Sequence, residues 1–145
     1  MVDRVRRPKQ YDDLLETLKD QKNIFPTYKD VLVFVACVGL CRGKRVQFDK
    51  ASEPINMQTF SEDFDQMAID VIAITAVNDD PMIMAAERSD ERVRIFEEYA
   101  CGGLEIIDHE LNQGKTDIED GLVRLILEEQ QDGSILTEIT DLSEV

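Results

Sequence analysis

The feature that most constrains the fold is a run of eleven residues without charge or strong polarity, from Val31 to Cys41. A segment that is apolar on all sides is typical of an element that its neighbours cover on all sides. Its β-branched residues would also suit a strand. Thr27 and Asp30, however, form a capping box, and Gly43 can end a helix in the left-handed conformation. The sequence therefore predicts a buried central helix that begins at Thr27 and runs to Cys41.

The spacing of apolar residues predicts further helices on both sides of this segment. One begins near Pro8, which suits a first helical turn, and ends around Lys22. Another begins at a second capping box, Thr59 with Glu62, and ends at about Val77. The residues expected to be buried are Tyr11, Leu14, Leu15 and Leu18 in the first of these helices and Phe60, Phe64, Met67, Val71 and Ile74 in the second.

Two more helices are expected in the C-terminal half. A long helix begins at the cap Ser89 and ends at Gly114, and a last one begins at a third capping box, Thr116 with Glu119. Gly133 ends the last helix. Inside the long helix, two adjacent glycines would cost about 1 kcal/mol each, so they indicate a local break or the close approach of another helix. The apolar face of the long helix consists of Val93, Phe96, Ala100, Gly103, Ile107 and Leu111, and the adjacent glycines are Gly102 and Gly103.

The segment from Lys44 to Asn56 changes character. Polar and apolar residues alternate from Arg45 to Phe48, and a turn-like stretch follows. This pattern predicts a hairpin or an ordered loop. The expected fold class is mainly α: a compact single domain of five to six helices, with this short extended hairpin or loop after the central helix. We expect residues 1–133 to form the helical domain and residues 134–145 to form an acidic tail or a short strand.

Length and composition place the chain among globular proteins. With 145 residues it suits one domain that buries a core without metal or disulfides. No apolar run approaches the roughly 18 residues that cross a bilayer, and the start, MVDRVRRPKQ, lacks the apolar region of a signal peptide. We therefore expect a cytoplasmic protein with no membrane partner. Its three cysteines, Cys37, Cys41 and Cys101, are expected to be reduced, buried and free of metal.

Charge is distributed unevenly along the chain. The net charge is −15, yet residues 1–50 hold 11 Lys and Arg against 7 Asp and Glu. Any contact with phosphate must therefore use the N-terminal third. Cations at the end of the central helix could simply stabilise its negative end by about 0.3–1 kcal/mol. Both readings stay open, and the candidate binding patch for DNA or an acidic partner consists of Arg6, Arg7, Arg42, Lys44, Arg45 and Lys50.

Catalytic signatures are absent from the sequence. It contains no G-x-x-x-x-G-K phosphate loop and no G-x-S-x-G elbow. The one histidine, His109, lies between two acids near a helix end, where a surface position is expected. Most carboxylates fall on the polar faces of the expected helices. We expect no enzymatic activity, catalytic residue, metal or cofactor, and a metal-dependent nuclease is a remote alternative.

Three segments carry a resemblance to a known family: RVRRPKQYDDLL, TYKDVLVFVACVGLCRGKRVQFDKASEPI and RIFEEYACGGLEII. They resemble Dnd system-associated protein 4, a small family of bacterial DNA phosphorothioation gene clusters. The resemblance covers Arg4 to Leu111. It implies an accessory role in a system that replaces a non-bridging phosphate oxygen with sulfur or restricts unmodified DNA. It supplies no catalytic residues.

Two hypotheses of function follow. The first is a non-enzymatic accessory protein of the modification or restriction system that contacts DNA weakly, or a subunit of the complex, through the N-terminal basic patch. The alternative is an acidic protein-interaction module, either an adaptor or an imitation of DNA charge, that docks on a basic partner. Salt-sensitive binding of DNA would separate the two hypotheses.

Overall fold

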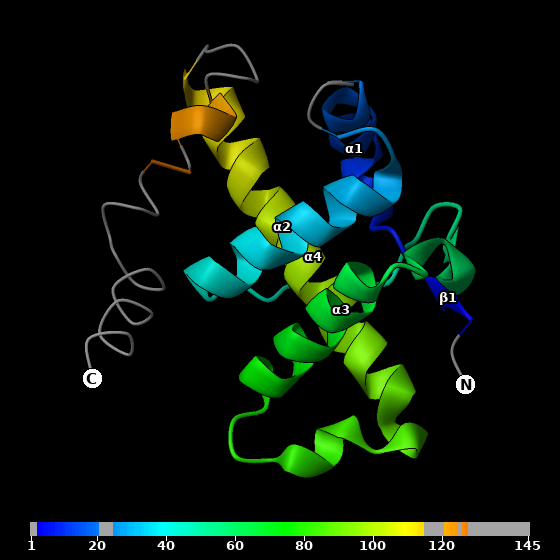
Figure 1. The fold of residues 1–145 in the computed structure, drawn as a ribbon. Helices are drawn as coiled ribbons and strands as arrows, with labels where there is room; N and C mark the ends of the chain where they lie inside the picture. The colour runs from blue at the N-terminus through cyan, green and yellow to red at the C-terminus, as the bar shows by residue number, and fades with distance from the viewer. Residues whose placement is uncertain (1–2, 21–24, 115–120, 125, 128–145) are drawn as a thin grey trace. The chain divides into compact units, whose positions relative to one another are not determined.

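The computed structural model describes residues 3–20, 25–114, 121–124 and 126–127 (Figure 1). The described part is mainly helical and contains one pair of short strands, which confirms the expected fold class. By its internal contacts the chain divides into two units, Met1–Glu105 and Ile106–Val145. No helix among the described residues has both the length and the apolar character needed to cross a membrane. The expected boundary between residues 133 and 134 lies outside the described residues.

The central helix α2 (Tyr28–Arg42) is present as predicted. Thr27 is its N-cap, and its hydroxyl accepts from the backbone amide of Asp30 at 3.3 Å. Gly43 ends the helix in the left-handed conformation, with φ 66°. Helices α1 (Asp12–Lys19) and α3 (Asp63–Ala76) both pack against α2. The buried residues of α2 are Val31, Leu32, Val33, Val35, Ala36, Val38 and Gly39.

One stripe of α2 stays open to solvent, which the sequence did not indicate. Cys37 is exposed, and Phe34 and Cys41 are half-buried. These three positions follow a spacing of three and four, so they share one side of the helix. The prediction that the cysteines are buried is therefore wrong for Cys37, although it is confirmed for Cys101. The Phe34 ring packs against Phe25 with ring centroids 5.0 Å apart.

The extended segment after α2 finds its partner at the N-terminus. Strand β1 (Arg4–Val5) pairs antiparallel with β2 (Ile55–Asn56), with Val5 opposite Ile55. Farther along, Pro8 bridges Ala51, so the register has slipped by one residue within the later segment. Pro54 lies in this irregular stretch, where it need not donate to a ladder. A 3₁₀ turn, η1 (Lys9–Tyr11), then leads into α1, whose Leu15 and Leu18 are fully buried.

The long helix α4 (Ser89–Gly114) has the predicted bounds and continues through both units. It crosses α2 in Figure 1, and the two helices approach most closely at Gly39 and Gly103. A β-carbon added to Gly103 would overlap the carbonyl oxygen of Val35, and one added to Gly39 of α2 would overlap that of Tyr99. The helix is unbroken there. For Gly103, close approach of a second helix is confirmed, whereas a β-carbon added to Gly102 would overlap the carbonyl oxygen of Lys44, which follows α2.

Helix α3 corrects the sequence reading in two respects. Its N-cap is Glu62, which makes no side-chain cap bond, and Thr59 lies in the preceding 3₁₀ turn η2 (Met57–Phe60). The capping box is therefore wrong. So is most of the expected buried stripe. Phe60 is buried edge-to-face against Phe96, but the other four members are exposed: Phe64 by 60%, Met67 by 54%, Val71 by 49% and Ile74 by 47%.

The buried side of α3 consists of Asp65, Ile69, Ile72 and Ala73. Asp65 explains the error, because a carboxylate argues for a solvent-facing position. Here Lys29 at the start of α2 reaches it, with Nζ 2.9 Å from Oδ2, and the two side chains are only 12% and 5% exposed. The contact with Asp65 is also the first cause of a raised pKa at Lys29. This pair lets the side of α3 that contains an acid turn inward.

Residues 121–124 and 126–127 are helical, in the region of the expected last helix. Its predicted capping box, Thr116 with Glu119, and its predicted end, Gly133, lie outside the described residues. Within the second unit, Gly121 approaches Leu111 closely and Arg124 pairs with Glu110 at 3.2 Å.

Candidate functional site

The two cationic segments of the sequence lie side by side where the N-terminal strand meets the segment after α2. The backbone amide of Lys9 donates to the carbonyl of Lys50 at 3.0 Å. The Arg6 guanidinium stands over the Phe48 ring, 4.6 Å from its centroid. Backbone pairing between distant parts of the chain therefore brings members of the candidate patch together.

Two arginines of the patch are held by consecutive glutamates of α4. Glu97 accepts from the backbone amide of Arg6 at 2.6 Å and from its Nε at 3.1 Å. Glu98 accepts from Nε of Arg45 at 2.7 Å. The two glutamate side chains are only 5% and 6% exposed, whereas the arginines are 41% and 39% exposed. The arginines thus cover buried carboxylates with one side and face water with the other.

Burial gives this arrangement an electrostatic cost. Burial raises the pKa of Glu97, and the contacts with the backbone and side chain of Arg6 oppose that rise. Removing one partner of a buried ion pair costs about 3–5 kcal/mol in general, because the other charge stays uncompensated. The half-exposed arginines lower that figure here. A phosphate that took Arg6 or Arg45 away from its glutamate would pay much of this cost.

The remaining predicted residues differ in their surroundings. Lys44 pairs with Glu105 at 3.5 Å, with both side chains nearly half exposed. Arg42 is half-buried in the last turn of α2. Lys50 is exposed and lines a surface hollow of about 450 Å³ together with Lys9 and Phe48.

Arg7 lies apart from these cations. Its Nε donates to the carbonyl of Glu53 at 2.7 Å, and its guanidinium stands 4.5 Å from the ring centroid of Tyr28. Tyr28 is the first residue of α2, whereas Lys44 and Arg45 follow the last turn. A helix of this length spans about 22 Å. The six predicted residues therefore do not all gather at one point.

The candidate patch left out two arginines that stand near Arg6. Arg4 and Arg94 line a second hollow of about 300 Å³ together with Arg6, Asp90 and Glu97. Arg94 was overlooked because it lies in an acidic helix, where a cation looks like part of a solvated face. It is four residues after Asp90 and three before Glu97, a spacing that places all three on one side of α4 and could have pointed to it.

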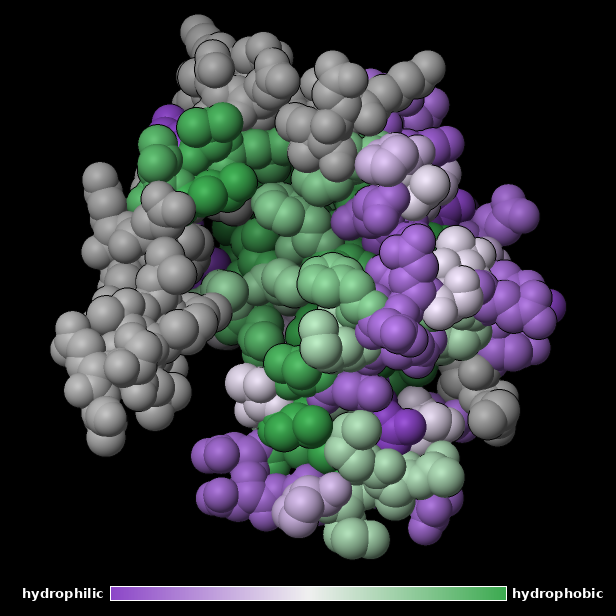
Figure 2. Space-filling view, viewed as in Figure 1, coloured by the Kyte–Doolittle hydropathy of each residue, from purple (hydrophilic) through white to green (hydrophobic). Residues whose placement is uncertain are grey.

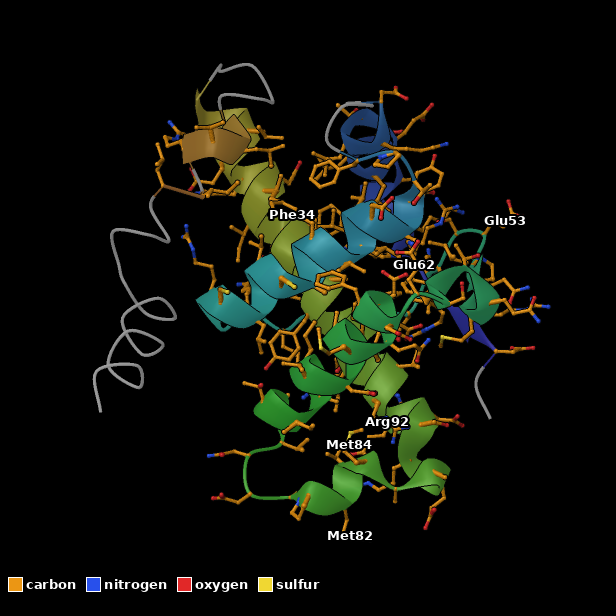
Figure 3. The ribbon with its side chains drawn as sticks, in the orientation of Figure 1. Phe34, Glu53, Glu62, Met82, Met84 and Arg92 are labelled. Carbon is orange, nitrogen blue, oxygen red and sulfur yellow. The ribbon has the colours of Figure 1, made fainter. Side chains whose placement is uncertain are left out.

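A second surface is formed by apolar side chains, and we call it the α3 face. It comprises the exposed row on α3 and the two exposed methionines of the 3₁₀ turn η3 (Pro81–Met84), which contacts α3. Figure 2 shows apolar residues gathered over α2, α3 and the segment after α3, and Figure 3 shows where the two methionines lie. The members of the α3 face are Phe64, Met67, Val71, Ile74, Met82 and Met84.

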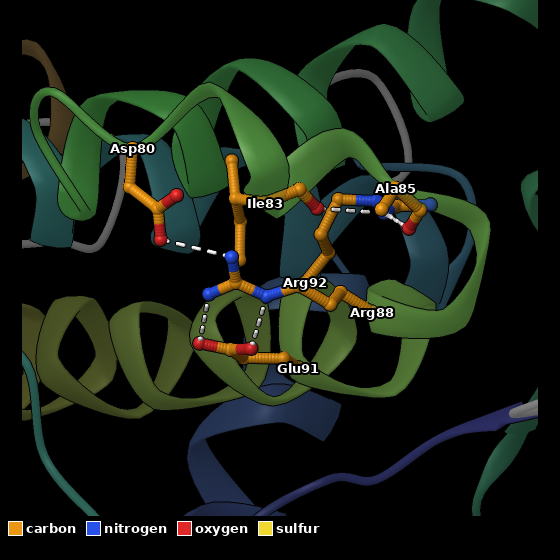
Figure 4. Close-up of polar contacts among 6 residues, drawn as sticks. All are labelled: Asp80, Ile83, Ala85, Arg88, Glu91 and Arg92. Atoms are coloured by element: carbon orange, nitrogen blue, oxygen red, sulfur yellow. Dashed lines mark hydrogen bonds and ion pairs between the residues drawn. The ribbon is translucent and has the colours of Figure 1, made fainter.

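Two arginines, Arg88 just before α4 and Arg92 in its first turn, fix the segment that presents these methionines (Figure 4). Arg92 donates through one nitrogen to the carbonyls of Ile83 and Ala85, both at 2.8 Å. Arg88 pairs with Asp80 and Glu91, each at 2.8 Å. Ile83 is fully buried, whereas Met82 and Met84 on either side of it are 62% and 40% exposed. The exposed methionines are thus part of an anchored structure.

Within the described residues, no group of three or more His, Cys, Asp and Glu side chains is placed to hold a metal ion. His109 is exposed, as expected. Burial raises the pKa of the Cys101 thiol to about 11.

Fold and surfaces together define a small, mainly helical protein with an internally paired cationic region and an open apolar helix face. Residues 4–145 match the family model of the DNA sulphur modification system-associated protein 4, and the chain belongs to that family. The match confirms the resemblance and extends it past Leu111 to the last residue. No curated protein and no solved structure gave a match.

Proposed function

We propose that this protein is a non-enzymatic accessory component of a DNA sulphur modification system and that it acts by binding another protein of that system. The accessory role in the system follows from the family. The observation that supports protein binding is the contrast between the two surfaces. The arginines best suited to phosphate are engaged by glutamates of α4, while the α3 face is exposed without a covering element in the described part of the chain. We expect it in the compartment that holds the DNA, the cytoplasm.

The test is reconstitution with the proteins encoded beside it, each tagged and purified separately. We expect one of them to form a stable complex with the full-length protein after nuclease treatment and at about 0.5 M salt, where contacts through phosphate are largely screened. If the protein forms no complex with any of the components, either singly or assembled, the proposal is overturned.

A second candidate function is weak, sequence-independent contact with DNA through the basic patch of Arg6, Arg7, Arg42, Lys44, Arg45 and Lys50. It is favoured by the exposure of the charged side chains: Arg6, Lys44 and Arg45 stay 39–47% exposed despite their partners. Binding through such contacts would position a duplex without reading its sequence, and it would fall steeply as salt is raised.

This candidate is tested by a salt titration of duplex binding. The variant Lys44→Glu/Lys50→Glu changes two exposed cations and leaves the buried glutamates paired. If the patch binds phosphate, the variant weakens binding and flattens the salt dependence by roughly one unit of slope per lost contact. A control, Arg124→Glu, changes a half-exposed cation of the second unit that is not a member of the patch. If the double variant, the control and the wild type bind the duplex equally well, this patch does not contact DNA.

A further inference from the structure

The α3 face lies in the longest part of the chain without Lys or Arg. Residues 51–87 contain no Lys or Arg and eight acids. Some of these acids are neutralised from elsewhere: Asp65 by Lys29, Asp70 by Arg92 and Asp80 by Arg88. Others stand in water at the two ends of the apolar row. Glu62 and Asp63 are exposed at the start of α3, and Asp79 is exposed just after its end.

The composition of the face is that of a binding surface. Aromatic residues and methionine are enriched at the centres of protein interfaces, and flexible methionine side chains adapt to partners of different shape. Exposed apolar residues are ordinary when they stand singly, but a row with two neighbouring methionines forms a continuous patch. The spacing of the row, three and four residues, makes it a straight stripe along one helix.

Charge then selects the kind of occupant. A second copy of this chain would bring the acids at the ends of one row against those of the other, and like charges across an interface cost free energy. Nucleic acid would be repelled for the same reason. A partner that has apolar side chains with Lys and Arg at both ends of them would cover the stripe and pair with the acids at its two ends.

We infer that the α3 face binds an amphipathic helical segment of another protein, with an apolar stripe flanked by basic residues. This inference rests on the proposed function and names the surface and the partner chemistry. The row from Phe64 to Ile74 extends over about 15 Å of helix, which a partner helix of about 12 residues would cover. Met82 and Met84, fixed by the Arg92 and Arg88 contacts, lengthen the surface beyond the end of α3.

The first experiment uses synthetic peptides with the full-length protein. One peptide has leucines at helical spacing and lysines elsewhere, a second has glutamates instead of the lysines, and a third has lysines with serines instead of the leucines. We expect the first peptide to bind at least about tenfold more tightly than either of the others. Preference for the acidic peptide, or equal binding of the peptide without leucine, would overturn the inference.

The second experiment locates the binding. The variant Met67→Gln/Val71→Gln replaces two half-exposed apolar residues of the face with good helix formers, and it is expected to weaken the first peptide about tenfold. The matched control Ile126→Gln/Leu127→Gln removes similar exposed apolar surface in the second unit and is expected to bind as the wild type does. Circular dichroism and thermal unfolding confirm that each variant is folded. Equal loss in both double variants would show that binding does not occur at the α3 face.

The complex with the system's own component separates this inference from the proposed function. If the component still binds Met67→Gln/Val71→Gln as tightly as the wild type, the α3 face is not the site, yet the accessory function stands. If no component binds the wild type, the proposed function fails. Sedimentation of the protein alone tests the remaining alternative. If the wild type is a dimer and Met67→Gln/Val71→Gln is a monomer, the occupant of the α3 face is a second copy of the chain.

Discussion

The crossing of α2 with α4 and the outer side of α3 are both apolar, yet one is covered and the other is open. At the crossing, Gly39 and Gly103 let two helix backbones approach until no β-carbon would fit between them. On α3, large side chains such as Phe64 and Met67 point outward and are more than half exposed. Small residues allow close helix packing, whereas large apolar residues at the same spacing require a partner surface that can receive them. The comparison teaches that apolar spacing marks a contact surface without saying whether this chain or another one covers it.

The largest effect is expected at the crossing. Gly103→Ala places a methyl group against the carbonyl oxygen of Val35, and two packed helices cannot separate locally. We expect the free energy of unfolding to fall by about 4 kcal/mol or more, although Gly→Ala ordinarily stabilises a helix by about 1 kcal/mol. Chemical denaturation measures this.

Gly43→Ala is the control for that change. It meets nothing within 4 Å, so its cost is only that of a left-handed backbone, about 1 kcal/mol. Should both glycine variants lose the same free energy, close packing at the crossing would not explain the adjacent glycines.

The two sides of α3 supply the next prediction. Ile72 is 1% exposed, so Ile72→Ala should lower the free energy of unfolding by about 2–4 kcal/mol. Its neighbour Val71 is 49% exposed, and Val71→Ala should change stability by less than about 0.5 kcal/mol. Urea titration of both variants compares the sides directly. A large loss for Val71→Ala would mean that the α3 face is covered in the isolated protein.

The charged contacts of α4 permit a similar test. Arg45→Ala leaves the buried Glu98 without its partner, and we expect a loss of about 2 kcal/mol, discounted for the exposure of the arginine. Lys44→Ala breaks an exposed pair and should cost less than about 1 kcal/mol. The two variants are compared by thermal unfolding at low and high salt. Equal losses would argue that Arg45 is held no more tightly than a surface cation.

The smallest effect concerns pH. The pKa of Glu97 is raised in the folded protein above its ordinary value of 4.5, chiefly by burial. A carboxyl group of this kind favours the folded state most when it is protonated. Its contribution is complete below pH 4.5 and is lost as pH rises through the folded-state pKa.

Glu97→Gln removes this titration. As pH rises from about 4 to about 7, the difference in unfolding free energy between wild type and variant should therefore shift in favour of the variant. Denaturation at several pH values measures the shift, and Glu105→Gln serves as an exposed control. An opposite slope would show that Arg6 outweighs burial at this site.

Local signals in the sequence determined the helices. The bounds of α2 follow from the cap at Thr27 and the left-handed glycine Gly43, because capping depends on residues within one turn. The bounds of α4 follow from the helical repeat of apolar residues between Ser89 and Gly114. The adjacent glycines also pointed correctly to a close helix contact. The basic composition of the N-terminal third was equally visible, but its meaning was not.

Only the tertiary structure decided which side of each helix is covered and which charges meet. Helix α3 is apolar around most of its circumference, so its period could not choose between the Phe64 side and the Ile72 side. The choice depended on Lys29, far away in sequence, which neutralises Asp65 and allows that side to turn inward. Likewise Arg6 and Arg45 look like free cations until α4 brings Glu97 and Glu98 against them. Capping and turn signals act within a few residues and can be read from the chain, whereas burial and charge pairing join residues that only the folded protein makes neighbours.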